Sequence, residues 1–363
     1  MRILVGMPEK GSQGGPAACE PPFIDELRRL GHDVEEEVYA HAESQAPLLK
    51  RISRVRKTAR RLRERLRSGN FDIVHINTAF DAKGVLRDAI VISCLPPTGA
   101  RVFLKFHGSD ARLLKTTNPL LRSLRRYLLS RVDGIGVLSS EERDNFLGAG
   151  VPENKVFVVK NVVEKNSQQP NPEFLRRWTL PDNRPLLLFI GRFISAKGLL
   201  DVIAGCGLLR DGGHQFLLLC IGDGPARSEA EALVQRLNLQ DYVRFFGYIP
   251  EEQTAGFYVN GDILLFPTYH TEGFPMVIFN AAAAGIPIIT TRIRAAADYL
   301  AEPENCLWVK PRSPGQLAEA TLTLLTRRDE RKIMSANNRL LAQRFSAERV
   351  TLEYLESYSR VLN

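Results

Sequence analysis

Two basic side chains stand where a buried strand in the second half of the sequence is expected to end. Residues 185–190 are almost entirely aliphatic, Arg192 follows after one glycine, and Lys197 comes five residues later, just before an apolar helical stretch. A guanidinium binds phosphate oxygens as a planar fork, and an ammonium binds them as a point charge. This pair fits a diphosphate group, although a single basic pair taken alone is more often a solvated part of the surface.

A second candidate anion site lies in residues 262–291, where a short apolar strand is followed by a polar loop and an alanine-rich helix. Pro275 suits the first position of that helix, because this position needs no amide hydrogen. The amides of Met276 and Val277 would then stand at the helix N-terminus, which favours a phosphate. Glu272 lies just ahead of the helix, where its carboxylate can accept hydrogen bonds from sugar-like hydroxyls.

A glycine-rich turn and the absence of several known motifs narrow the classes of enzyme that fit this sequence. The expected strand 215–221 ends in the turn Gly222–Pro225, where the backbone can approach a flat ligand closely. No Asp-x-Asp occurs in the sequence, so we expect no metal ion held by carboxylates. Neither a P-loop nor a complete G-x-G-x-x-G follows a strand, which argues against an NTPase and an NAD enzyme.

Both halves of the chain alternate short apolar runs with amphipathic stretches, the pattern of βαβ units around a parallel sheet. The expected strands are 2–6, 33–39, 72–76, 101–106, 134–138, 155–159, 185–190, 215–221, 242–246, 262–266 and 286–290. The expected helices include 21–30, 50–67, 119–131, 198–210, 226–237, 275–284 and 345–360. The fold class is therefore α/β.

The two sets of strands predict two Rossmann-like domains with a cleft between the carboxyl ends of their sheets, where ligands of open α/β sheets bind. Prolines cluster among polar residues in 161–184, which favours a loop or linker there. We expect domains at 1–165 and 166–344. A C-terminal helix within 345–363 is expected to cross back to the first domain.

Charge and cysteine content bear on location. Residues 1–170 contain 28 basic and 20 acidic residues, whereas residues 171–363 contain 21 of each, so the net charge of +8 comes from the first part. The five cysteines are scattered without a C-x-x-C pair, which favours a reducing compartment. The first apolar run is too short for a signal peptide, and no run is long enough to cross a membrane. We expect a cytoplasmic protein.

Two basic, leucine-striped stretches carry much of the excess charge. Residues 50–67 contain ten cations and one acid, with apolar residues spaced by three and four as in an amphipathic helix. Residues 112–131 form a second such patch. One interpretation is that the apolar stripe packs on a sheet and the cations are solvated; the other, which we favour, is docking to anionic phospholipid at the inner face of a membrane. Nucleic-acid binding ranks far lower, because interleaved aromatic residues are missing.

Taken together, these motifs resemble the retaining GT-B glycosyltransferases of family 4, the glycogen-synthase-like group. The matching pieces of the second half are Gly191-Arg192, Lys197-Gly198, Gly222–Pro225, Phe246-Gly247, Glu272–Pro275, Ala284–Pro287 and Asn305–Val309. The looser matches of the first half are Gly14-Gly15, Gly31–Val34, Asp72–His75 and Phe106–Asp110. The resemblance covers essentially the whole chain.

The resemblance implies a role for each matching residue. The implied catalytic residues are His107, which would contact the transferred sugar, and Glu272, which would lie near the donor sugar. The implied donor-binding residues are Gly14, Gly15, Arg192, Lys197, Gly247, Phe274, Met276, Val277 and Asn280. The first domain would bind the acceptor and the second the nucleotide sugar.

The resemblance also implies a reaction. A sugar would move, with retention, from a nucleotide diphosphate donor to a hydroxyl of a glycan or lipid-linked acceptor. The products would be cell-surface polysaccharide or glycolipid. The leaving diphosphate would take the acceptor's proton, so the protein would supply positioning and charge stabilisation. No cofactor and no metal ion are expected, since Arg192 and Lys197 would balance the diphosphate charge.

The sequence departs from the family pattern at three places. Asn280 replaces the second glutamate of the family's Glu-x7-Glu pair, which would otherwise bind the ribose hydroxyls. Arg294-Ala295 replaces a glycine pair, and Val162 replaces the glycine after Asn161. An alternative hypothesis is therefore a catalytically silent relative that binds a nucleotide or a partner without turnover.

Overall fold

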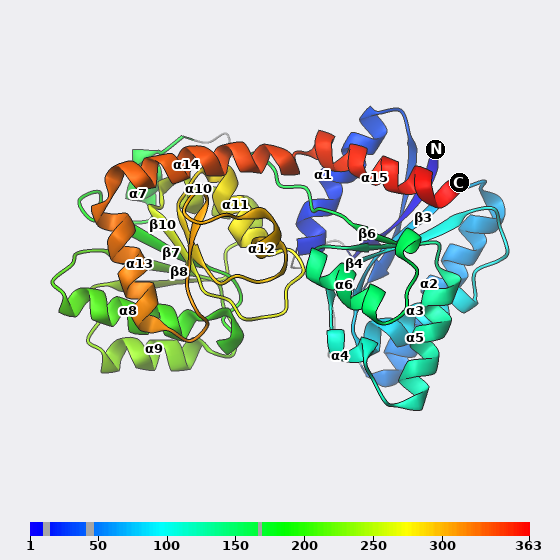
Figure 1. Cartoon of the computed structure of the whole chain (residues 1–363), viewed down its shortest axis with the longest axis horizontal. Helices are drawn as coiled ribbons and strands as arrows, with labels where there is room; N and C mark the ends of the chain where they lie inside the picture. Colours follow the sequence, from blue (N-terminus) through cyan, green and yellow to red (C-terminus); the bar gives the residue numbers. More distant parts are fainter. Residues whose placement is uncertain (10–14, 41–46, 166–168) are drawn as a thin grey trace. The chain divides into compact units, whose positions relative to one another are not determined.

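The chain folds into two compact units, each built around a parallel sheet of six strands (Figure 1). The computed structural model describes residues 1–9, 15–40, 47–165 and 169–363. Unit 1 comprises residues 1–162, 271–274 and 347–363, and unit 2 comprises residues 163–270 and 275–346. The expected α/β class with two Rossmann-like domains is confirmed.

The sheet of unit 1 has the strand order β2-β1-β3-β4-β5-β6. Its strands are β1 (Arg2–Pro8), β2 (Asp33–Ala40), β3 (Ile73–Phe80), β4 (Arg101–Ser109), β5 (Gly134–Val137) and β6 (Val156–Val158). Every neighbouring pair is parallel. The central strands are buried on both faces, which is why they read as near-continuous apolar runs in the sequence. All six expected strands of this half are confirmed.

Helices from the described residues of the first part of the chain flank this sheet. They are α1 (Gly15–Arg29), α2 (Leu48–Ser68), α3 (Ala82–Ser93), α4 (Ala111–Leu114), α5 (Pro119–Arg131) and α6 (Ser140–Gly148). The expected start of the first helix at residue 21 is wrong, because α1 begins at Gly15 and continues through Pro21 and Pro22. Phe23 and Leu27 of α1 are buried in the core, so packing overrides the local preference of proline.

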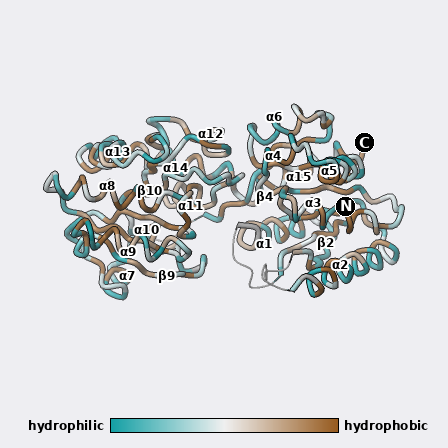
Figure 2. The backbone as a smooth tube through the Cα atoms, turned by 90° about the horizontal axis from the view of Figure 1, so that it is seen from below, coloured by the Kyte–Doolittle hydropathy of each residue, from teal (hydrophilic) through white to brown (hydrophobic). Residues whose placement is uncertain are grey.

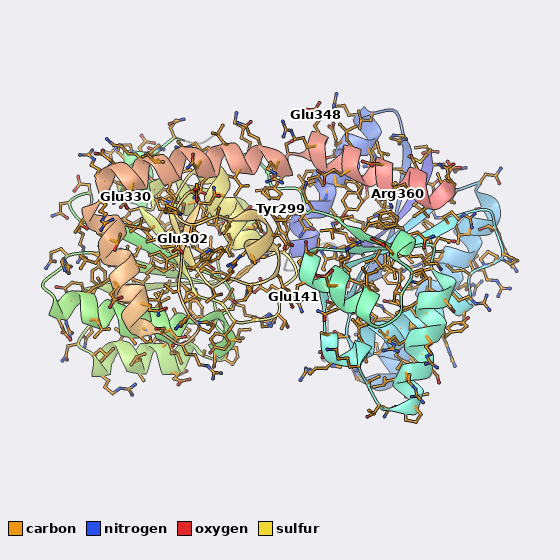
Figure 3. All side chains as sticks on the ribbon, viewed as in Figure 1. Glu141, Tyr299, Glu302, Glu330, Glu348 and Arg360 are labelled. Atoms are coloured by element: carbon orange, nitrogen blue, oxygen red, sulfur yellow. The ribbon has the colours of Figure 1, made fainter. Side chains whose placement is uncertain are left out.

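The C-terminal helix α15 (Ala347–Leu362) belongs to unit 1, where it lies against α1 and β4 (Figure 1). Tyr354 and Tyr358 of α15 are fully buried, and the Tyr358 hydroxyl lies 2.5 Å from Nδ1 of His75 on β3. Glu348 in its first turn and Arg360 in its last turn match the polarity of the helix dipole (Figure 3). The last helix of the chain thus completes the core of the first unit.

The sheet of unit 2 has the strand order β12-β11-β10-β7-β8-β9. Its strands are β7 (Leu186–Ile190), β8 (Leu217–Ile221), β9 (Val243–Gly247), β10 (Ile263–Phe266), β11 (Ile288–Thr290) and β12 (Cys306–Trp308). The five expected strands of this half are confirmed, and β12 is additional. With three residues, β12 is too short to show a periodic pattern.

The helices of unit 2 are α7 (Pro172–Arg177), α8 (Leu199–Asp211), α9 (Arg227–Arg236), α10 (Glu251–Asn260), α11 (Met276–Ala284), α12 (Arg294–Tyr299), α13 (Pro314–Thr326) and α14 (Arg328–Ala342). The expectation that residues 161–184 form only a loop is wrong for α7. Pro172 occupies the first turn of this helix, and the Asn171 side chain caps it by accepting from the Glu173 amide at 2.8 Å.

Candidate active site

Three glycines bring the carboxyl ends of β7, β8 and β9 close together. Gly191, Gly222 and Gly247 have φ values of 149°, 138° and 71°, in the region that favours glycine. The Gly222 amide donates to the carbonyl oxygen of Gly247 at 2.8 Å. A Cβ atom on Gly222 would lie 1.9 Å from the carbonyl oxygen of Gly191, so no other residue fits there. The glycines therefore let the ends of these strands pack closely against one another, and we call this end of the sheet the glycine edge.

The two predicted diphosphate-binding cations lie on the connection from β7 to α8. A short 3-10 turn, Ser195–Lys197, ends at Gly198, which has φ of 81°. This turn places Nζ of Lys197 3.6 Å from the position that a Cβ atom of Gly191 would take. The same Nζ lies 5.6 Å from the ring centre of Phe266, the last residue of β10. Arg192 is exposed on the same connection. Lys197 therefore lies at the glycine edge.

The helix α11 presents its N-terminus at the same edge of the unit 2 sheet, because it follows β10. It begins at Met276, with Val277 next, so both predicted residues are in the first turn. The expected position of Pro275 is off by one residue, since it precedes the helix as its N-cap. Gly285 ends the helix with φ of 76°, as predicted. The positive end of the helix dipole thus lies where an anion is expected.

Asn280, which stands where the family pattern has a glutamate, has a carboxylate beside it. Its Nδ2 atom donates to Oε1 of Glu251, the first residue of α10, at 3.2 Å. Burial, and then the charge of Glu251, raise the pKa of Tyr258, which also bonds Asn280. Sequence reasoning missed Glu251, because only the tertiary structure brings it to Asn280. The carboxylate that the family pattern has on α11 is thus replaced here by one on the neighbouring helix α10.

The Arg294 backbone explains why a glycine pair is usual at this position. Arg294 is buried, and its φ of 39° is one that residues with a Cβ rarely adopt. It begins α12, the helix that follows β11. The turn therefore keeps the conformation that glycine favours although the side chain has changed.

In unit 1, His107 lies near the carboxyl end of β4 within a buried polar cluster. Its Nε2 lies 2.7 Å from Oδ1 of Asn77 on β3. The amide nitrogen of Asn77 donates to Oε2 of Glu20 on α1 at 3.1 Å, and the ammonium of Lys105 donates to Oε1 of Glu20 at 2.5 Å. The Glu20 and Lys105 side chains are only 0% and 2% exposed. We call these four residues the His107 cluster.

Burial and charge set the protonation states of the His107 cluster. Burial alone would raise the pKa of Glu20, but Lys105 outweighs it and holds this pKa below its usual range. Burial alone would lower the pKa of Lys105, yet the attraction of Glu20 raises it. The two side chains therefore form a charged pair. Burial, reinforced by the charge of Lys105, lowers the pKa of His107 to about 3, so its imidazole is neutral at pH 7.

The cluster contains ligand types that bind metal ions, since Sγ of Cys19, a carboxylate oxygen of Glu20 and a ring nitrogen of His107 lie within 4.8 Å of one another. However, Lys105 already makes the contact with Glu20 that a cation would make. These residues therefore fit an internal ion pair better than a metal ion. Sequence reasoning missed Glu20 and Lys105, for which the only signal was a lysine inside the apolar strand 101–106.

The predicted site residues are divided between the two units. Glu272 is partly buried and Phe274 is buried, and both lie in the segment 271–274 of unit 1. Gly15 is the first residue of α1, whereas Gly14 lies outside the described residues. Unit 1 therefore contains the described site residues Gly15, His107, Glu272 and Phe274. Unit 2 contains Arg192, Lys197, Gly247, Met276, Val277 and Asn280.

A cavity of about 280 Å³ in unit 2 is separate from this site. Its lining includes Gly261, which precedes β10, and Pro287, which precedes β11. These positions are at the amino ends of the parallel strands, whereas the glycine edge and Lys197 are at the carboxyl ends. Arg328, Arg331, Lys332 and Arg339 of α14 also line the cavity.

The buried histidines of unit 1 predict a loss of stability in mild acid. Burial lowers the pKa of His75 to about 4 and that of His107 to about 3. Unfolding returns both to about 6.5, so the unfolded chain binds more protons below that pH. Between pH 7 and pH 5 we expect the free energy of unfolding to fall by on the order of 2 kcal/mol for each histidine, measured by urea denaturation. His107→Gln should remove one histidine's share; an unaltered pH dependence in that variant would contradict the assignment.

Two family models match successive parts of the chain. Residues 22–166 match the family described as Glycosyltransferase Family 4, and residues 170–341 match Glycosyl transferases group 1. The chain is 28% identical over 256 residues to 2-deoxystreptamine glucosyltransferase of Streptomyces kanamyceticus, covering 68% of this chain and 65% of that protein. It is 24% identical over 250 residues to the GDP-mannose-dependent alpha-(1-6)-phosphatidylinositol monomannoside mannosyltransferase of Mycobacterium tuberculosis, covering 66% and 64%. The aligned part thus spans slightly less than two thirds of either relative.

Solved structures extend the likeness of the fold to the whole chain. The structure of HepE from Anabaena, determined with UDP-glucose, superimposes with a TM-score of 0.78 and 19% identity over 99% of both chains. Because the two family matches together account for most of the sequence and the fold match spans both units, this chain belongs to the group 1 glycosyltransferases of the GT-B fold.

Proposed function

We propose that this protein transfers a sugar from a nucleotide diphosphate donor to a hydroxyl of a glycan or lipid-linked acceptor, in the synthesis of a cell-surface polysaccharide or glycolipid. The observation that carries the proposal is the placement of Lys197 at the glycine edge of the unit 2 sheet, beside Gly191 and Phe266. The named relatives support the same class, since one is a glucosyltransferase and the other a GDP-mannose-dependent mannosyltransferase.

We propose that the donor diphosphate lies between this glycine edge and the N-terminus of α11. Lys197 and Arg192 would balance its charge, and the first-turn amides of α11 would bind its oxygens. The ribose hydroxyls would be bound by the oxygen of Asn280 together with the carboxylate of Glu251, which lies 3.2 Å from the Asn280 amide nitrogen. The replacement of a glutamate by Asn280 is then compatible with donor binding.

Nucleotide binding and transfer can be tested separately. We expect one of UDP, GDP, ADP and dTDP to raise the melting temperature, because a ligand of the native state stabilises it. The corresponding nucleotide sugar should then glycosylate an acceptor, as detected by mass spectrometry. Stabilisation without transfer to any acceptor would favour the catalytically silent alternative. No stabilisation by any of the four would contradict a nucleotide-sugar site.

We further propose that the reaction retains the anomeric configuration and needs no metal ion. The cations at the glycine edge would do the work of a metal by stabilising the leaving diphosphate. Initial rates should be the same with and without EDTA, and an α-linked donor should give an α-linked product by NMR. Loss of activity in EDTA, or an inverted product, would refute the respective part of this proposal.

We also propose a cytoplasmic protein that docks on anionic phospholipid at the inner face of a membrane. The five cysteines all lie in the described ranges and form no disulfide there, which suits a reducing compartment. No helix in the described ranges has the length and apolar character that a bilayer crossing requires. Alternating hydrophilic and hydrophobic bands run along α2 (Figure 2). Peripheral docking would therefore rely on amphipathic helices.

The structure divides the apolar stripe of α2 into two parts. Ala59, Leu62 and Leu66 are buried in the core of unit 1, so this part of the stripe stabilises the fold. At the other end of α2, Leu49 is 82% exposed and Ile52 is 41% exposed, among cations. The second basic stretch, 112–131, likewise buries most of its leucines but leaves Leu120 67% exposed. The exposed end of α2 is the part available to a bilayer.

The double variant Leu49→Ser/Ile52→Ser is expected to weaken binding to vesicles of phosphatidylglycerol about tenfold, because two side chains no longer enter the lipid. Cosedimentation at low salt measures the effect, and high salt should weaken the wild type as well. Leu340→Ser is the matched control, since Leu340 of unit 2 is 62% exposed. Equal binding by wild type and double variant would contradict docking through this end of α2.

A further inference from the structure

The Asn77 amide in the His107 cluster can adopt only one orientation. Its Nδ2 lies 3.1 Å from Oε2 of Glu20 and 3.3 Å from the carbonyl oxygen of Gly6. A carboxylate oxygen and a carbonyl oxygen are both acceptors, so the amide nitrogen of Asn77 must face them. Its Oδ1 must then face His107.

This orientation determines which nitrogen of His107 carries the proton. Oδ1 of Asn77 can only accept, so Nε2 of His107, 2.7 Å away, must be the N–H donor. In the neutral ring, Nδ1 is then an acceptor. Nδ1 is buried, and within the described part of the chain it has no hydrogen-bond partner. It is therefore the atom of His107 that remains for a ligand.

The charge on Glu20, together with the Gly6 carbonyl oxygen, keeps the Asn77 amide from turning over. A protonated glutamate, or a glutamine, could donate to Oδ1 of Asn77 and allow the opposite orientation. Glu20 stays charged because the ammonium of Lys105 lies 2.5 Å from Oε1, and the Cys19 thiol donates to the same oxygen at 3.5 Å. The ion pair between α1 and β4 therefore controls a hydrogen bond on β3.

We propose that Glu20, held by Lys105, is a positioning residue that fixes Asn77 and so keeps the proton of His107 on Nε2, leaving Nδ1 to accept a hydrogen bond from a substrate hydroxyl. This proposal rests on the proposed function for the identity of the substrate, but not for the tautomer. A substrate group that meets Nδ1 of His107 must then be a hydrogen-bond donor.

The tautomer can be read directly by NMR on the full chain labelled with ¹⁵N-histidine. We expect a single neutral form of His107 with its proton on Nε2, assigned by the loss of its signals in His107→Gln. In Glu20→Gln/Lys105→Met, which buries no unpaired charge, signals of the second tautomer should appear. Tyr358→Phe is the matched control, because it removes a hydroxyl bonded to His75 in the same core; it should leave the His107 tautomer unchanged.

If the double variant does not fold, a single substitution tests the same effect on the His107 tautomer. Lys105→Met removes the cation, so the buried Glu20 should become protonated, and the second tautomer should appear again. In either variant we expect kcat for transfer to be about tenfold lower, because in part of the molecules Nδ1 of His107 carries the proton and cannot accept a substrate hydroxyl.

The outcomes separate this proposal from the proposed function. A proton on Nδ1 of His107 in the wild type would overturn the proposal, and so would a single Nε2–H tautomer in variants without the ion pair. If the tautomer behaves as expected but no nucleotide sugar is turned over, the proposed function fails while the positioning role of Glu20 stands.

Discussion

Lys197→Ala is expected to lower kcat/KM for transfer about 10²- to 10³-fold, chiefly through kcat. The ammonium lies 5.6 Å from the ring centre of Phe266 and next to the backbone of Gly191, at the carboxyl edge of the unit 2 sheet. In the proposed reaction negative charge would grow on the leaving diphosphate as the sugar departs, so the ammonium would stabilise the transition state more than the bound donor. Initial rates at saturating donor measure the effect.

Lys310→Ala is the matched control for this substitution, since Lys310 is an exposed lysine of the same unit. It should leave the rate unchanged. Lys197→Ala should melt close to the wild type, because a half-buried cation at a ligand site contributes little to folding. A rate near that of the wild type would refute the assigned role of Lys197.

Glu20→Leu is expected to reduce the free energy of unfolding by about 3–5 kcal/mol, the usual cost of leaving a buried charge without its partner. Glu20 is the carboxylate that pairs with Lys105 at 2.5 Å, and both side chains are almost completely excluded from solvent. Leucine fills a similar volume but leaves the ammonium of Lys105 in an apolar environment. Urea denaturation at pH 7 measures the loss.

The double variant Glu20→Leu/Lys105→Met should recover most of that stability, because it removes both charges. Glu64→Leu serves as a matched control. It breaks the pair of Glu64 with Arg60, whose side chains are 60% and 81% exposed, and should change stability little. If the double variant is as unstable as Glu20→Leu, the ion pair is not the source of the loss.

Local patterns in the sequence were sufficient to predict most of the framework. The strands of both sheets follow from short apolar runs separated by amphipathic stretches, because strands buried on both faces must be apolar along their whole length. The helix over 119–131 was predicted with the bounds that the structure has. Gly285 was recognised as a cap, since a left-handed residue after a helix is almost always glycine. Such features depend on neighbours a few residues away.

The sequence could also assign the proposed diphosphate-binding cations, Arg192 and Lys197, to a strand end, but it could not show which side chains surround them. The start of α1 was misplaced because two prolines outweighed a packing preference that only the folded core supplies. From the sequence, Asn280 appears only as the loss of a carboxylate from the site. In the structure the carboxylate of Glu251 on α10, 29 residues away in the chain, lies beside it. In both cases the deciding partner comes from another element.

What the sequence alone determined is a pair of parallel-sheet units with a glycosyltransferase pattern of glycines, cations and a helix N-terminus. What only the tertiary structure decided is the His107 cluster. Glu20 is 57 residues from Asn77 and 85 residues from Lys105 along the chain. No periodicity connects such positions, because their contact depends on how α1 packs across β3 and β4. The protonation of His107 follows from that packing.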